Sequence, residues 1–283
     1  MKIQIKAALE FGMLGVLVTS SLTAHAEPWL LIDDFESPQR FSSWIQEDTK
    51  NETQPRVETP QVTQVQLEII DGVSNHYLLK KPAPEGVIGN RKALTYSRLP
   101  TSVPVGSTYT FYTRINVQSF PNNHAFGISN MDGLGIKKND YNAFEPTLRV
   151  TDKIESNGFK NDGALMVKVE QGYANVINPK LNRSAMPLVA GTWYETWYVV
   201  NNATKAQGGQ RYDVYLKGGE EFPTQTKVFS EATFRMQREL PLTHFMMNCN
   251  TGPMSSPYGN GGLKYDDLYM TPGLNLTYPQ SNN

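Results

Sequence analysis

Short segments with strand-like patterning run through almost the whole chain and limit what it can fold into. Residues 65–70 and 109–117 place apolar or aromatic side chains at every second position, which is typical of half-buried β-strands. The strongest such segment is 193–200 (WYETWYVV), and beyond residue 26 no helical period persists for more than about two turns. Further strands are expected at 30–36, 76–79, 125–129, 147–150, 164–169, 173–177, 211–216, 244–248 and 263–270. Because Gly, Pro and Asn turns separate these segments, we expect an all-β domain, an antiparallel β-sandwich or jelly roll.

The first 26 residues have the features of a bacterial signal peptide. Lys2 and Lys6 precede an apolar stretch, 11–18, and Ala24-His25-Ala26 has the small residues that a signal peptidase accepts. The apolar stretch is shorter than the roughly 20 residues that a membrane span needs, so we expect no transmembrane anchor. We therefore expect a secreted or periplasmic protein.

The chain divides into three parts on this interpretation. They are a signal peptide at 1–26, a β-sandwich domain at 27–272 and a loosely ordered C-terminal tail at 273–283. Within the domain, the polar segment 46–61 is expected to be a long loop.

Composition excludes some classes of protein. The chain has 26 Lys and Arg against 27 Asp and Glu, and this balance argues against a nucleic-acid partner. Hydrophobic residues make up 39% of the chain, enough to build a core. The single cysteine, Cys249, excludes an intramolecular disulfide and is expected to be a buried structural thiol.

Three segments together carry a resemblance to a known superfold. An Asp-Asp-Phe-Glu segment ends at Glu36, a Tyr-Asp-Asp-Leu-Tyr segment starts at Tyr265, and a hairpin-like stretch spans 191–219. They resemble secreted bacterial laminin-G-like and concanavalin-A-like jelly-roll proteins over most of 27–272. The resemblance implies that the first and last strands lie side by side. Because that fold hosts lectins, glycosidases, lyases and adhesive modules, it implies no single activity.

Carboxylates gather in the two terminal segments. If the first and last strands pair, side chains such as Asp33 and Asp267 approach one another and repel unless a cation or an arginine neutralises them. Calcium prefers such oxygen ligands, and related jelly rolls often hold a structural calcium between their terminal strands. The predicted calcium ligands are Asp34, Glu36 and Asp266; solvated strand ends or arginine pairing are the alternatives.

The aromatic segment 193–200 offers a candidate glycan surface. Trp193 and Trp197 share one face of the strand, Tyr194 and Tyr198 the other, and one face must be core. If the tryptophans fill the core, the tyrosine face becomes the surface. The loop 254–263, with Asn248, Asn250 and the loop 119–123, could add a polar rim. The predicted ligand-binding residues are Tyr194, Tyr198, Tyr212, Asp213 and Tyr258.

Catalytic motifs are scarce. The sequence has no Gly-x-Ser-x-Gly, no His-Glu-x-x-His and no Glu-x-Asp-x-x-Glu pattern. Jelly-roll polysaccharide lyases commonly use a tyrosine with a histidine or arginine, and His124, His244 and Arg114 are the candidates for such roles.

The function expected from the sequence is binding of a carbohydrate or matrix glycan, with calcium as a candidate structural ion. One alternative is a polysaccharide lyase or another glycan-degrading enzyme. The other is a structural envelope or adhesion protein without a glycan ligand. Whether the protein is an enzyme stays open, with the balance toward a binding protein. The polysaccharide or cell-surface glycan and the oligomeric state stay open as well.

Overall fold

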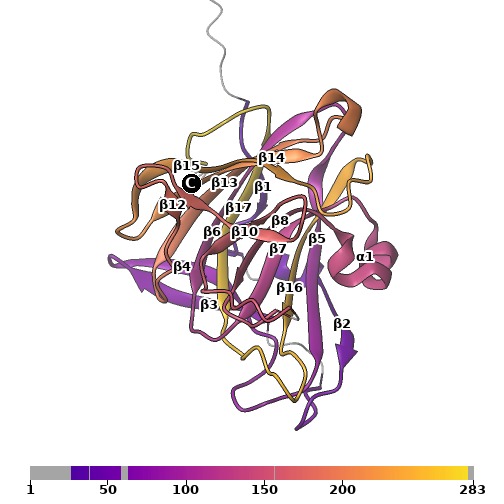
Figure 1. Ribbon diagram of the computed structural model, residues 1–283, viewed down its shortest axis with the longest axis vertical. Helices are drawn as coiled ribbons and strands as arrows, with labels where there is room; N and C mark the ends of the chain where they lie inside the picture. Colours follow the sequence, from indigo (N-terminus) through magenta and orange to yellow (C-terminus); the bar gives the residue numbers. More distant parts are fainter. Residues whose placement is uncertain (1–26, 38, 59–62, 156, 280–283) are drawn as a thin grey trace, which may run out of the picture.

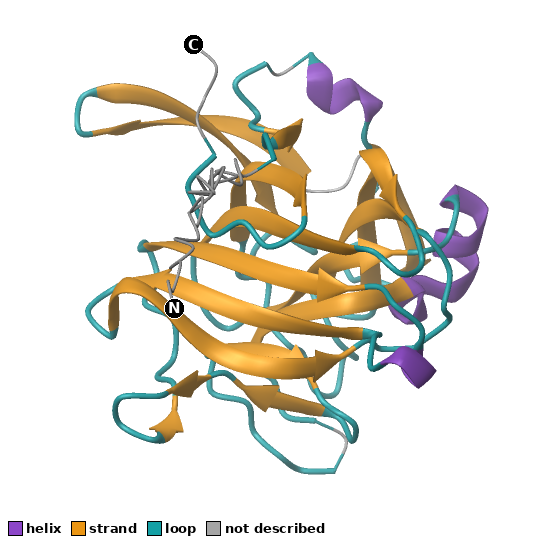
Figure 2. Ribbon diagram, turned by 90° about the horizontal axis from the view of Figure 1, so that it is seen from above, coloured by secondary structure: helices purple, strands orange, loops and turns teal. Residues whose placement is uncertain are grey.

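A computed structural model describes residues 27–37, 39–58, 63–155 and 157–279 of the chain. The expected signal peptide lies outside the described residues. The described chain forms two large antiparallel sheets and little helix (Figures 1 and 2).

The first sheet contains eight strands. In spatial order they are β15 (Phe222–Thr233), β14 (Arg211–Gly218), β13 (Trp193–Asn201), β6 (Thr108–Val117), β17 (Leu263–Pro272), β4 (Val73–Lys80) and β3 (Thr63–Ile70), with β1 (Leu30–Asp33) beside β17. Leu30 of β1 pairs with Met270 of β17, so the expected pairing of the first and last strands is confirmed.

The second sheet contains seven strands. They are β10 (Tyr173–Asn175), β9 (Leu165–Lys168), β8 (Phe144–Thr151), β7 (Asn123–Ser129), β16 (Leu242–Asn250), β5 (Arg91–Val103) and β2 (Ile45–Asn51). A small separate pair is formed by β11 (Ile177–Asn178) and β12 (Arg183–Ser184). The short helical elements are η1 (Arg40–Ser43), α1 (Gly133–Asn139), η2 (Asp140–Ala143) and η3 (Lys205–Gln207).

The core lies between the two sheets and follows from the period of two. In β6, Phe111 and Ile115 face the core, whereas Tyr112 and Arg114 alternate with them and face outward. In β8, Leu148 and the other inward side chains meet them from the second sheet. Burying each large apolar side chain contributes roughly 1.5–3 kcal/mol. The expected all-β sandwich of the jelly-roll type is confirmed.

The outer face of the second sheet is partly covered. Leu94, Tyr96 and Met246 form a small cluster there with Ile136 of α1 and Phe144. The N-terminus of α1 is fixed by Asp132, whose carboxylate accepts a hydrogen bond of 2.7 Å from the backbone of Gly135. Figure 1 shows α1 beside β5, at one side of the sandwich. The α1–η2 segment therefore leaves only part of this face open.

The expectation of a long loop at 46–61 is wrong in its first part, and the described part of the tail contacts the domain. The polar segment 46–61 begins as strand β2, which pairs with β5 at the edge of the second sheet. Over residues 273–279 of the tail, Asn275 is buried and the Thr277 carbonyl accepts a hydrogen bond of 3.1 Å from Trp197.

Candidate functional site

A cleft of about 620 Å³ opens on the outer face of the second sheet. Its floor crosses four neighbouring strands, β16, β7, β8 and β9, at paired positions: Asn248, Ala125, Arg149 and Met166. Its walls come from the segment around Tyr141, residues 153–155 and 157–161, the turn before Tyr173, and the loops that carry Arg235 and Tyr258. The floor residues face outward because they alternate with core residues such as Leu148 and Val150.

The cleft carries an excess of positive charge. Four cations line it, Lys92, Arg149, Lys153 and Arg235, against two carboxylates, Asp140 and Glu155. Asp140 pairs with Lys92 at 2.7 Å, and Glu155 pairs with both Arg149 and Lys153 at 3.0 Å. Among the described residues, Arg235 has no carboxylate within ion-pair distance. This excess charge gives the cleft a positive electrostatic potential. The low-dielectric protein around the cleft strengthens that potential, so the cleft attracts anions.

Two tyrosines meet at one wall of the cleft. The Tyr141 hydroxyl donates a hydrogen bond of 2.9 Å to the Tyr173 hydroxyl, and Arg235 Nη1 donates to the same Tyr173 oxygen at 3.2 Å. The Arg149 guanidinium lies 4.5 Å from the centre of the Tyr173 ring, and that of Arg235 lies 4.3 Å from the Tyr141 ring. Burial raises the pKa of Tyr141 well above its ordinary value, while Arg149 and Arg235 act in the opposite direction. Tyr141 therefore keeps its proton at neutral pH.

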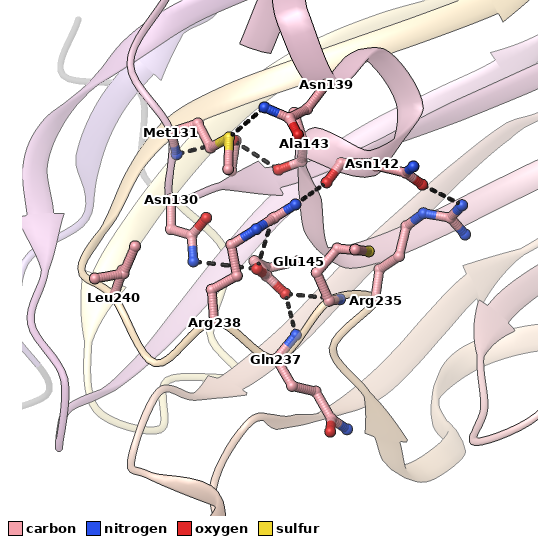
Figure 3. A network of polar contacts seen from close by, with 12 residues as sticks. Asn130, Met131, Asn139, Asn142, Ala143, Glu145, Arg235, Gln237, Arg238 and Leu240 are labelled. Atoms are coloured by element: carbon pink, nitrogen blue, oxygen red, sulfur yellow. Dashed lines mark hydrogen bonds and ion pairs between the residues drawn. The ribbon is translucent and has the colours of Figure 1, made fainter. Parts of the chain in front are cut away.

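A buried carboxylate organises this wall from behind (Figure 3). Glu145 has no exposed surface, and it accepts hydrogen bonds from the backbone of Met236 at 3.0 Å and Gln237 at 2.8 Å. Arg238 donates to it at 2.9 Å and Asn130 at 3.1 Å. Burial raises the pKa of Glu145, and the backbone donors of Met236 and Gln237 and the positive charge of Arg238 oppose that effect.

Amides and an aromatic ring complete the rim on the other side. Asn123, Asn248, Asn250 and Tyr258 line the cleft, so the structure brings together the polar rim expected from the sequence. Lys153 Nζ lies 4.7 Å from the centre of the Tyr258 ring. Asn248 donates a hydrogen bond of 2.8 Å to Asp140, which ties the floor to the wall.

Three of the predicted ligand-binding residues face the core instead. Tyr194, Tyr198 and Tyr212 are at most 4% exposed and belong to the main core cluster. Tyr198 and Tyr212 offer no surface to a glycan, so their assignment to a binding surface is wrong. Tyr194 lines a second cavity of about 730 Å³ and not the cleft on the second sheet. The sequence pattern could not tell the two faces of β13 apart, because both are covered. Tyr194 and Tyr198 face the core, and Trp197 packs outward against Tyr112 under the C-terminal tail.

The remaining predicted ligand-binding residues lie apart. Asp213 pairs with Lys227 at 2.6 Å in the first sheet, away from the cleft. Tyr258 lines the cleft.

The candidate catalytic residues are not brought together. His124 is buried and donates a hydrogen bond of 2.9 Å from Nε2 to the Gly261 carbonyl, and burial lowers its pKa to about 3. His244 lies on β16 beside Tyr96, with Nδ1 2.9 Å from the Thr243 hydroxyl. Arg114 belongs to the first sheet and pairs with Asp266 and Asp267. These three side chains lie on different faces and sheets, so they do not form one site. Of the three, His124 is among the residues that line the cleft.

The predicted calcium ligands have other partners. Asp34 lies 3.8 Å from Arg40, Glu36 pairs with His76 at 2.9 Å, and Asp266 pairs with Arg114 at 3.3 Å. Over the described ranges, no group of three or more His, Cys, Asp or Glu is arranged to hold a metal ion. Calcium stays a prediction.

Sequence reasoning missed most of the cationic wall. Arg149 carries a detectable signal, because it stands between the apolar residues Leu148 and Val150 of an otherwise regular strand. Tyr141 and Arg235 lie outside the strands, where no periodicity points to them.

No known family model and no curated protein matches the sequence significantly. Several solved structures are similar to the chain at low identity. A GH131 β-glucanase catalytic domain from Podospora anserina is 9% identical over 71% of this chain and 73% of that chain, with a TM-score of 0.43. A PL-14 alginate lyase from Aplysia kurodai is 14% identical over 74% and 87%, with a TM-score of 0.46. The lectin UEA-II, in complex with galactose, is 8% identical over 88% and 97%, with a TM-score of 0.41.

These likenesses concern the fold alone. The described part of the chain has no helix that is long and apolar enough to cross a membrane.

Proposed function

We propose that the protein binds an anionic polysaccharide, a polyuronate, in the cleft on the second sheet. One observation carries this proposal: four cations, three tyrosines and five asparagines line a single cleft of about 620 Å³. The volume lies within the usual range for ligand sites.

Each kind of side chain matches one part of such a ligand. Arginine and lysine pair with sugar carboxylates, and the arginine fork does so with two parallel hydrogen bonds. The asparagine amides can donate to and accept from sugar hydroxyls. Aromatic rings such as that of Tyr258 offer an apolar face to the C–H surface of a sugar ring. A neutral glycan would use the amides and rings but leave the excess positive charge unmatched.

A second candidate function is cleavage of the bound polyuronate by β-elimination, which the tyrosine pair favours. In that reaction a base removes the proton on the carbon next to the carboxylate. A carbon–carbon double bond forms, the glycosidic C–O bond breaks, and the leaving oxygen takes up a proton. Tyr141, which keeps its proton, is suited to give it to the leaving oxygen. Tyr173 is the candidate base: as the phenolate it would take up the carbon-bound proton, and the hydrogen bonds from Tyr141 and Arg235 would stabilise that phenolate. Arg149 and Arg235 would stabilise the charge that develops on the carboxylate.

Affinity electrophoresis of the purified protein tests both candidates. Native gels would each contain one polymer: alginate, polygalacturonate, xylan, laminarin or chitosan. We expect retardation by the two polyuronates and none by laminarin. A cleared zone in a polyuronate gel would establish cleavage as well. Normal migration in every gel would contradict the proposal and favour a structural or protein-binding role.

Two lysines provide a matched pair of variants. Lys92 in the cleft is 39% exposed in its side chain and pairs with Asp140 at 2.7 Å. Lys227 on the first sheet is 41% exposed and pairs with Asp213 at 2.6 Å. We expect Lys92→Gln to weaken retardation by the polyuronates and Lys227→Gln to leave it unchanged. If Lys92→Gln and Lys227→Gln weaken retardation equally, the polymer is attracted by the overall charge of the protein and not bound at the cleft.

A further inference from the structure

We propose that Arg235 is the residue that distinguishes a sugar carboxylate from a neutral or esterified sugar, and that Glu145 positions it without touching the glycan. This inference rests on the proposed function of the cleft.

Arg235 differs from the other cations of the cleft in what surrounds it. Lys92, Arg149 and Lys153 each have a protein carboxylate within 3.0 Å, so an incoming carboxylate must compete with Asp140 or Glu155. Arg235 has no such competitor among the described residues. Its charge is therefore available to a ligand.

Arg235 also has unused donors. A guanidinium has five N–H donors. Nη1 donates to the Tyr173 hydroxyl at 3.2 Å and Nη2 to the Asn142 side-chain oxygen at 2.8 Å, while Nε is buried without a hydrogen-bond partner. The two neutral acceptors orient the group but leave its charge uncompensated, which suits it for a carboxylate.

Glu145 fixes the backbone that carries Arg235. The Glu145 carbonyl accepts a hydrogen bond of 3.0 Å from the Arg235 backbone, and its carboxylate accepts from the backbones of Met236 and Gln237 (Figure 3). Gln237 has a φ of 55° and Glu239 a φ of 49°, conformations that non-glycine residues rarely adopt without support. The segment therefore depends on Glu145 for its shape.

The same network also fixes the guanidinium end of the Arg235 side chain. Arg238 binds both the Glu145 carboxylate and the Asn142 carbonyl. Asn142 in turn accepts from Arg235 Nη2, and the Arg235 guanidinium lies over the Tyr141 ring of the same η2 turn. Glu145 thus connects the backbone of Arg235 with the turn on which its guanidinium rests. It does not line the cleft.

The test compares two forms of one polymer. Dissociation constants would be measured by calorimetry for polygalacturonate and for its highly methyl-esterified form, which differ in the carboxylate. We expect the wild-type protein to prefer the free acid. Because a hydrogen bond to a charged group contributes about 1.5–3 kcal/mol, Arg235→Gln should weaken binding of the free acid by about 10- to 100-fold. The affinity for the ester should change by less than about threefold. The variant would therefore lose most of the preference for the free acid over the ester.

Glu145→Gln tests the positioning role. We expect a reduced preference for the free acid, with a smaller loss than in Arg235→Gln, because the guanidinium remains but is less well fixed. A merely structural role would lower both affinities together and leave their ratio unchanged. If Glu145→Gln fails to fold, Asn142→Ala removes the acceptor of Nη2 at an exposed position and should reduce the same ratio. Lys227→Gln, on the other sheet, should leave both affinities unchanged.

The outcomes separate this inference from the proposed function. A wild-type protein that binds neither polymer contradicts the proposed function. A wild-type protein that prefers the free acid, with the preference intact in Arg235→Gln, overturns the role of Arg235 alone. An unchanged ratio in Glu145→Gln or in Asn142→Ala overturns the positioning role.

Discussion

The hydroxyl groups of Tyr141 and Tyr173 share a hydrogen bond of 2.9 Å across a separation of 32 residues. Tyr141 comes from η2, on the segment that covers the outer face of the second sheet, and Tyr173 from β10 at the edge of that sheet. The contact places two phenol groups beside Arg149 and Arg235 at one wall of the cleft.

Tyr141→Phe separates binding from chemistry. The variant keeps the ring under Arg235 and removes only the hydroxyl. We expect polyuronate affinity to stay within about threefold, and the stability to fall by about 1 kcal/mol for the lost hydrogen bond. If the wild-type protein clears polyuronate gels, the rate of cleavage should fall by about 10²- to 10⁴-fold, the usual contribution of a general acid. Cleavage at the wild-type rate would exclude Tyr141 from the reaction.

Gly127, two residues after the floor residue Ala125 in β7, stands where the neighbouring strand leaves no room for a side chain. It lies in β7 opposite Thr147, and an added Cβ atom would lie 2.0 Å from the Pro146 carbonyl oxygen. We expect Gly127→Ala to lower the free energy of unfolding by about 3 kcal/mol or more, since backbone must move. Urea denaturation would measure the change.

The matched control for that change is Gly72→Ala. Gly72 has a φ of 81° in the β3–β4 turn, and no atom lies within 4 Å of its added Cβ. Only the cost of the left-handed conformation remains there, about 1–2 kcal/mol. If Gly127→Ala and Gly72→Ala lower the free energy of unfolding equally, the contact with Pro146 is not the cause of the loss at Gly127.

The period of two predicted the architecture because it reports directly which side chains face the core. Segments such as 109–117 and 193–200 are strands, and the terminal strands pair as expected. The alternation did not identify the core face of β13, because both faces of that strand are apolar. Trp197 is covered by the tail and by Tyr112, so alternation could not tell the core face from the covered outer face.

The cleft could be predicted only in part, because it depends on contacts between distant segments. Asn248, Asn250 and Tyr258 were expected at a rim near the loop 119–123, and they line the cleft with Asn123. Arg235 enters the cleft because Glu145, 90 positions earlier, binds the backbone beside it. No local pattern in the sequence encodes such a pairing.

His124 makes the stability depend on pH. Burial lowers its pKa from 6.5 to about 3, so the folded protein keeps this ring neutral. Between these two values the unfolded chain binds a proton that the folded protein does not, so stability is lost as the pH falls. Each pH unit well inside this window costs about 1.4 kcal/mol for one such group.

His124→Gln should remove that contribution. The variant is expected to be less stable than the wild type at pH 7, because the fit of the ring is lost. The difference in free energy of unfolding between the wild type and the variant should shrink by about 1.4 kcal/mol per pH unit below pH 6. Urea denaturation at several pH values would measure it. A gap that stays constant down to pH 4.5 would show that His124 is not the group responsible.

Arg114 pairs with Asp266, one of the three carboxylates for which calcium was expected, and with the neighbouring Asp267. It pairs with Asp266 at 3.3 Å and Asp267 at 3.0 Å, and its guanidinium lies 4.7 Å from the centre of the Trp193 ring. Burial and the charge of Asp267 raise the pKa of Asp266, and Arg114 opposes that rise. Arg114→Met should destabilise the protein by about 3 kcal/mol, because two partly or fully buried carboxylates lose their cation.

Calcium should then replace the missing charge if Asp34, Glu36 and Asp266 can bind it. We expect calcium to raise the melting temperature of Arg114→Met by more than that of the wild type, because the guanidinium no longer competes for Asp266. The double variant Arg114→Met/Asp266→Asn should lose the calcium response and recover part of the stability. A calcium response of equal size in the wild type and in Arg114→Met would show that the metal and Arg114 do not share Asp266. No response in either protein would contradict the calcium prediction itself.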